Sequence, residues 1–83
     1  MTTYYEDLER LRGKLIAAGL NSWASRLLSA ERGAATSGEA LSATGTVLRE
    51  LQESPVPMDM ALREAVQSTL DEAQKRQRPS WSN

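Results

Sequence analysis

Two pairs of glutamates, Glu6 with Glu9 and Glu50 with Glu53, have a spacing that could do chemistry. Residues three apart lie on the same side of an α-helix, so the two carboxylates of a pair could share a hard cation such as Ca²⁺ or Mg²⁺. The sequence has no histidine, so it lacks the Glu-x-x-His motif of helical di-metal sites. Because charged side chains are mostly exposed in proteins, solvated helix surfaces explain both pairs, and we predict no metal and no cofactor.

Catalytic groups are scarce in this chain. It has no cysteine and no histidine, which excludes disulfides, thiolate chemistry and the usual proton shuttle near neutral pH. The sequence also contains no Gly-x-Ser-x-Gly motif, no phosphate-binding loop and no dinucleotide-binding fingerprint. Since the remaining carboxylates, amines and hydroxyls fill no named catalytic role, we predict that the protein is not an enzyme.

The segment Thr36-Ser37-Gly38-Glu39 could do another kind of chemistry, the binding of an anion at a helix N-terminus. The same four residues match the capping box, in which a Thr and a Glu side chain satisfy two backbone N–H groups. Capping explains the pattern without a ligand. The segment therefore predicts a helix that starts near Ser37, and a bound anion is the minor alternative.

Apolar residues at alternating steps of three and four predict the helices that position these groups. The pattern gives four helices, over about 3–18, 22–32, 37–53 and 58–77. Gly33 ends the second helix. Pro55 and Pro57 come just before the fourth helix, where a proline interrupts no intrahelical hydrogen bond.

A tight corner joins the first two helices. Gly19 suits the left-handed position just past a helix end, and Asn21 suits the N-cap of the next helix. Trp23 and Leu27 lie on one face of that helix, so the largest side chain would point into the space that the corner encloses. We therefore predict Trp23 at the centre of the core.

The four apolar stripes together define a predicted core and a fold. The core residues are Leu8, Leu11, Leu15, Trp23, Leu27, Leu41, Leu48, Leu51, Leu62, Val66 and Leu70. The first and fourth helices have the strongest stripes, and we expect these two helices to pair. Four amphipathic helices with short connections predict an all-α fold, a small bundle in which neighbours are antiparallel.

Length and composition fit one such domain. The chain has 83 residues, of which 40% are hydrophobic and 25% charged, as in ordinary folded proteins. We assign residues 1–78 to a single helical domain and 79–83 to a mobile C-terminal tail, because Pro79 stops a helix. Trp81 in this tail is a candidate partner contact, since tryptophan is enriched at interface hot spots, although it could equally fold back on the domain.

By elimination, the sequence predicts a small helical protein–protein interaction module that acts as a subunit, adaptor or inhibitor of another protein. The partner is unknown. A homodimer is a further candidate assembly, because the second helix is short and only 5% of the residues are aromatic. The N-terminus has no basic start followed by an apolar run, and no stretch of about 18 apolar residues occurs. We therefore expect a cytoplasmic protein without a membrane partner.

A helix-turn-helix regulator that binds nucleic acid is the alternative function. The segment 18–28 superficially matches the turn and recognition helix of such proteins, with Gly19 at the turn. The match fails at Lys14, Leu15 and Ser25, where the motif has an apolar, a small and a buried aliphatic residue respectively. The net charge of -1 also weighs against a nucleic-acid partner.

A group of small uncharacterised bacterial all-helical proteins is similar to this chain over about its middle half. The similarity rests on helix ends and core positions, namely Leu15, Gly19, Trp23, Ala24, Leu27, Gly33, Glu39, Leu41, Leu48 and Leu51. This resemblance implies an all-helical fold and carries no function with it.

Overall fold

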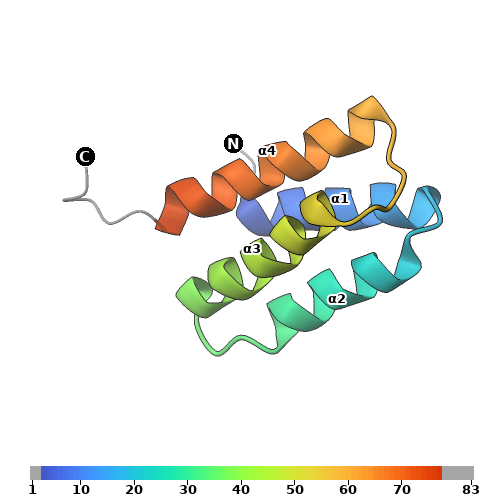
Figure 1. Ribbon diagram of the computed structural model, residues 1–83. Helices are drawn as coiled ribbons and strands as arrows, with labels where there is room; N and C mark the ends of the chain where they lie inside the picture. Colours follow the sequence, from blue (N-terminus) through green and yellow to red (C-terminus); the bar gives the residue numbers. More distant parts are fainter. Residues whose placement is uncertain (1–2, 78–83) are drawn as a thin grey trace.

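The protein is an all-α bundle of four helices, as its sequence predicts. The computed structural model describes residues 3–77, and in this part of the chain only helices and their connections occur. Each helix runs back along the one before it (Figure 1). The helices are α1 (Tyr4–Ala17), α2 (Asn21–Arg32), α3 (Ser37–Glu53) and α4 (Met60–Gln77).

The corner between α1 and α2 is tighter than predicted. Gly19 has a φ of +80°, the left-handed conformation expected of it. The N–H of Gly19 donates to Ile16 O at 3.0 Å and the N–H of Leu20 to Leu15 O at 2.8 Å, which is a Schellman motif. Leu20 then also opens α2, because its carbonyl accepts from Ala24 N at 3.2 Å. The prediction of Asn21 as N-cap is wrong, since Leu20 holds that position without a side-chain cap.

Side-chain caps start the other helices. Thr3 Oγ1 accepts from Glu6 N at 3.2 Å before α1, and Thr36 Oγ1 accepts from Glu39 N at 3.1 Å before α3. Glu39 Oε2 accepts in return from Ala35 N at 3.1 Å, one residue before the N–H that a capping box uses. The predicted helix start at Ser37 is confirmed.

Helix α4 begins two residues later than predicted. Met58 lies in the connection, and Asp59 Oδ1 accepts from Leu62 N at 2.7 Å, so Asp59 is the cap. Pro55 and Pro57 disfavour helical backbone in the residues that precede them, which keeps the connection extended as far as this cap.

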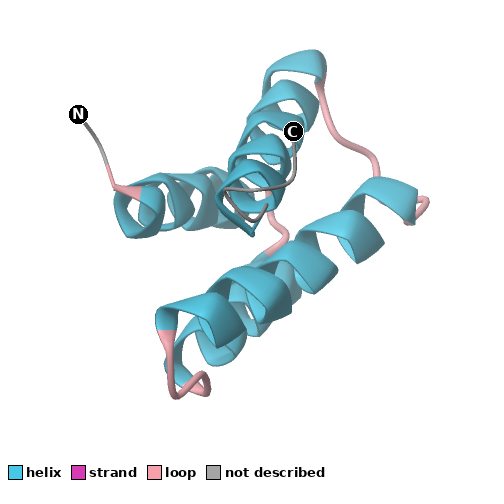
Figure 2. Ribbon diagram, turned by 90° about the vertical axis from the view of Figure 1, so that its left-hand side faces the viewer, coloured by secondary structure: helices cyan, strands magenta, loops and turns pink. Residues whose placement is uncertain are grey.

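The four helices close into a ring around one core. Contacts join α1 to α2, α2 to α3, α3 to α4 and α4 to α1, so α4 packs against α1 as expected and against α3 as well. Figure 2 shows the bundle from its side. Nine of the predicted core residues are buried: Leu8, Leu11, Leu15, Leu27, Leu48, Leu51, Leu62, Val66 and Leu70.

Trp23 and Leu41 lie at the edge of this core instead of inside it. Both are half-buried and pack against the buried cluster. On α2 the core-facing position belongs to Ala24, which is 5% exposed, so Trp23 is turned by one helical step toward the surface. On α3 the buried positions next to Leu41 are taken by Ala40 and Thr44. The prediction of Trp23 at the core centre is therefore wrong, because the smaller neighbour lets α2 approach more closely.

Two further features bear on the predictions. Within the described residues, no helix is both long and apolar enough to cross a membrane. The predicted tail, with Trp81, lies outside the described residues.

Candidate functional site

A groove between α1 and α2 is a mostly apolar hollow on the described surface. It has a volume of about 630 Å³. Its apolar lining consists of Gly13, Ile16, Ala24 and Leu28. Its polar lining consists of Glu9, Arg12, Asn21 and Ser25. We call this feature the α1–α2 groove.

The periodicity of α1 determines what the groove presents. The stripe Tyr4, Leu8, Leu11 and Leu15 faces the core and is buried. The residues one position further along the chain lie about 100° around the helix, so they line the outside of the bundle. Ile16 belongs to this outer set, and 57% of its surface is exposed, so it adds accessible apolar surface to the outside of α1.

The charged groups of the groove are not used by the fold. No ion pair involves Glu9 or Arg12 within the described residues. Arg12 Nε is buried and has no hydrogen-bond partner there. Gly13, between them and Ile16, has nothing within 4 Å of where a Cβ would lie, so the wall is open at this point. The groove therefore combines accessible apolar surface with unpaired charges of both signs.

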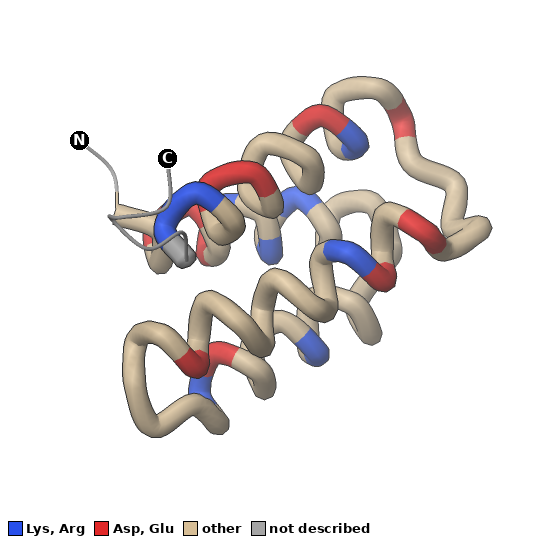
Figure 3. Tube along the Cα trace, turned by 60° about the vertical axis from the view of Figure 1, so that its left-hand side comes forward, with Lys and Arg blue, Asp and Glu red and all other residues tan. Residues whose placement is uncertain are grey.

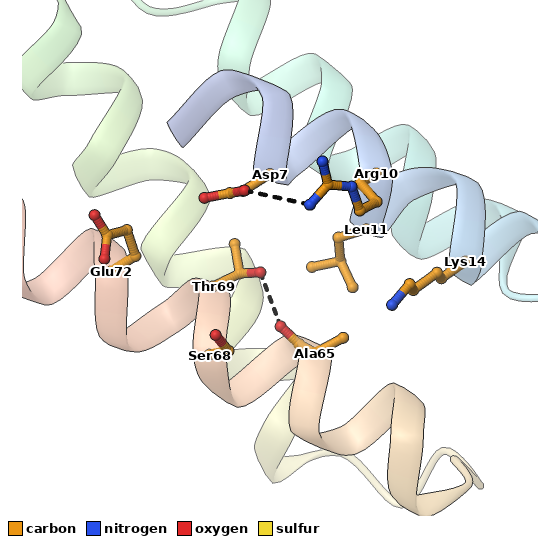
Figure 4. Close-up of a pocket in the computed structure, with 8 residues that line it drawn as sticks. All are labelled: Asp7, Arg10, Leu11, Lys14, Ala65, Ser68, Thr69 and Glu72. Atoms are coloured by element: carbon orange, nitrogen blue, oxygen red, sulfur yellow. Dashed lines mark hydrogen bonds and ion pairs between the residues drawn. The ribbon is translucent and has the colours of Figure 1, made fainter. Parts of the chain in front are cut away.

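A second hollow, between α1 and α4, is smaller and more polar. Its volume is about 220 Å³. Arg10 reaches Asp7 at 3.9 Å, and the Thr69 hydroxyl donates to Ala65 O at 2.8 Å (Figure 4). Its polar groups are thus partly satisfied by their own helices. Thr69 is the buried polar residue of this lining, and its hydroxyl proton is already donated within α4, so it is not free to donate to a ligand.

The carboxylate pairs singled out in the sequence lie on the exposed surfaces of α1 and α3. Glu6, Glu9, Glu50 and Glu53 are all exposed. Glu50 is bonded to Arg26 across the α2–α3 interface. No group of three or more acidic side chains that could hold a metal ion occurs in the described part of the chain.

The start of α3, where a bound anion is the minor alternative, uses two of its backbone donors within the cap. Glu39 N donates to Thr36 Oγ1, and Ala35 N donates to the Glu39 carboxylate. Both bonds belong to the cap itself, so capping accounts for this segment without a bound anion.

The helix-turn-helix segment is engaged in packing. The Arg26 guanidinium carbon lies 4.6 Å from the Trp23 ring centroid, and the same side chain bonds to Glu50. Along the described chain, every helix carries both basic and acidic side chains (Figure 3). This mixture gives no basic face of the kind that binds nucleic acid.

The fold is a small four-helix bundle, and the α1–α2 groove gives it an accessible apolar surface. Comparison of the chain with protein-family models, with curated proteins and with solved structures found no match.

The sequence predictions missed the residues that make this groove. Neither Ile16 nor Leu28 is among the predicted core or contact residues. The signal that points to them is a second stripe on α1, in which apolar Tyr5 and Ile16 stand outside the buried stripe. Such a stripe is interpretable only once the buried one is known, because either could face the core.

Proposed function

We propose that the protein is a small interaction module that binds another polypeptide through the α1–α2 groove. The exposure of Ile16 beside Ala24 and Leu28 is the observation that carries this proposal. A helical peptide binds such grooves by inserting apolar side chains spaced three and four apart. The polar residues Glu9, Arg12 and Ser25 at the groove suit the rim of an interface, which stays solvated and sets orientation.

A polypeptide suits this surface better than other ligands do. The groove is open, and Arg12 Nε is the one atom of its lining in the described chain that is buried without a hydrogen-bond partner, whereas orienting a small molecule takes several convergent polar groups. Nucleic acid binding depends on clustered positive charge, and the groove carries one acidic and one basic side chain, Glu9 and Arg12. The alternative hypothesis, a helix-turn-helix protein that binds nucleic acid, is tested by the nuclease treatment in the experiment below.

Affinity capture with surface variants tests the proposal. The tagged full chain is incubated with lysate of its own cells, with and without nuclease, and the retained polypeptides are identified. We expect one polypeptide in stoichiometric amount with the wild type, its loss with Ile16→Asp, and its retention with Met60→Asp. Met60 is the matched control because it is 76% exposed and lies at the start of α4, away from the groove.

Two results would contradict the proposal. Material that disappears on nuclease treatment would favour the nucleic-acid alternative. A polypeptide that Ile16→Asp retains as well as the wild type does would place the binding surface elsewhere.

A further inference from the structure

The outward-facing residues of α1 form a stripe of their own, and three of its four residues also line the α1–α2 groove. Tyr5, Glu9, Arg12 and Ile16 follow one another at steps of four, three and four, which places them on one side of the helix. We call them the outer stripe. Its ends are apolar, since Tyr5 is 41% and Ile16 57% exposed. Its middle carries one negative and one positive charge.

The outer stripe is complementary to the outer stripe of a second copy that runs in the opposite direction. The point midway between residues 10 and 11 is the midpoint of the Tyr5–Ile16 pair and also of the Glu9–Arg12 pair. A second α1 laid antiparallel across this point would bring Tyr5 against Ile16 of the second copy and Glu9 against Arg12 of the second copy. A two-fold axis produces each contact twice.

We infer that the outer stripe and the adjoining α1–α2 groove bind a second copy of this chain, in an antiparallel pairing of the two α1 helices. The inference rests on the proposed function and names the occupant of the same surface. Charge complementarity selects the antiparallel arrangement. A parallel pairing in register would set Glu9 against Glu9 and Arg12 against Arg12, and like charges across an interface are unfavourable.

The groove provides space for the aromatic end of the stripe. Gly13 lies one turn before Ile16, and a Cβ there would meet nothing within 4 Å. The pairing places Tyr5 of the second copy at Ile16. The space at Gly13, beside Ile16, is therefore open to the Tyr5 ring and is not filled by a side chain. The Tyr5 ring packs over an apolar surface that includes Ala24 in this arrangement, because Ala24 lines the same groove.

The free charges gain partners in the same arrangement. Glu9 and Arg12 form no ion pair within residues 3–76, and Arg12 Nε has no acceptor there. Each carboxylate of the pairing faces a guanidinium of the other copy. Exposed ion pairs contribute little affinity and mainly set orientation, so Tyr5 and Ile16 supply most of the attraction.

Analytical ultracentrifugation of the full chain tests the assembly. Because interfaces below about 1,200 Å² are typical of weak complexes, the concentration is varied from about 10 µM to about 1 mM. We expect a reversible monomer–dimer equilibrium. Ile16→Asp should lower the association constant at least about tenfold, and the control Met60→Asp should leave it unchanged.

Charge reversal tests the pairing register. Glu9→Arg and Arg12→Glu should each lower the association constant at least about tenfold, because each places like charges opposite one another twice. An equimolar mixture of these two variants should form a heterodimer, since every contact is then between opposite charges. The double variant should dimerise like the wild type. Circular dichroism checks that each variant keeps its helix content.

The outcomes separate this inference from the proposed function. A wild type that stays monomeric at the highest concentration overturns it, as does a dimer that is insensitive to both charge reversals. If such a monomer still captures a different polypeptide through Ile16, the proposed function stands without the second copy. If Ile16→Asp affects neither self-association nor capture, both fail.

Discussion

The hydroxyl oxygens of Tyr4 and Thr44 lie 2.8 Å apart inside the core and link the first turn of α1 to the middle of α3. Thr44 donates its own proton to Ala40 O at 2.6 Å, so Tyr4 is the donor in the bond between the two side chains. Tyr4 is 2% exposed and Thr44 is fully buried, so neither hydroxyl has water as an alternative partner. This bond fixes how α1 and α3 meet across the bundle.

We predict that Thr44→Val destabilises the protein more than Tyr4→Phe does. Without Thr44, the buried Tyr4 hydroxyl loses its acceptor, at a cost of about 1–3 kcal/mol. Without the Tyr4 hydroxyl, Thr44 still bonds to Ala40, and the cost is about 0.5–1.5 kcal/mol. Urea unfolding measures both. The double variant should cost less than the two single costs together, and strict additivity would show that the two hydroxyls are not coupled.

The same pair predicts a loss of stability in alkaline solution. Burial raises the pKa of the Tyr4 hydroxyl above its ordinary value of 10.0, although the hydrogen bond with Thr44 partly offsets this. The unfolded chain therefore loses this proton first as the pH rises. The stabilisation that Tyr4 contributes is complete at pH values below the pKa of Tyr4 in the unfolded chain. It is lost as the pH rises through the higher pKa of Tyr4 in the folded protein.

The free energy of unfolding, measured at pH about 8 and about 11, tests this effect. Wild type should lose more stability between the two values than Tyr4→Phe does, because all other titrating groups are shared. Equal losses would show that Tyr4 is not protected from ionisation in the folded state.

The four helices could be predicted from sequence because each stripe repeats with the period of an α-helix. Leu8, Leu11 and Leu15 are spaced three and four residues apart, which places them on one face of a helix. All three are completely or almost completely buried in the structure. Gly19 could also be predicted, since a left-handed residue at a helix end is a local property of the chain.

The core centre, the Tyr4–Thr44 bond and the groove could not be predicted in this way. Periodicity places Trp23 and Ala24 on adjoining faces, and the choice between them depends on how close α2 comes to its neighbours. The Tyr4–Thr44 bond joins residues 40 apart in the chain, so no local pattern contains it. The groove exists only because Ile16 and Leu28 come from two helices that the corner brings together.

Two glycines should respond oppositely to alanine. Gly13 lies exposed within α1 with free space around it, so Gly13→Ala should stabilise the helix by about 0.5–1 kcal/mol. Gly19 has a positive φ, so Gly19→Ala should destabilise the protein by about 1–2 kcal/mol. For a domain of this size, each kcal/mol shifts Tm by roughly 4–8 °C, which thermal denaturation resolves. Shifts of the same sign would contradict the assigned conformations.

Trp23→Ala should cost less stability than Leu48→Ala, although it removes the larger side chain. Leu48 is fully buried, and its truncation leaves a cavity that costs about 2–5 kcal/mol. Trp23 is half-buried at the edge, where water can fill the space it leaves, so we expect about 1–2.5 kcal/mol. The loss includes the contact of its ring with Arg26, whose bond to Glu50 remains. Chemical denaturation measures the loss in free energy of unfolding for both variants. Equal losses for Trp23→Ala and Leu48→Ala would indicate that Trp23 lies at the centre of the core.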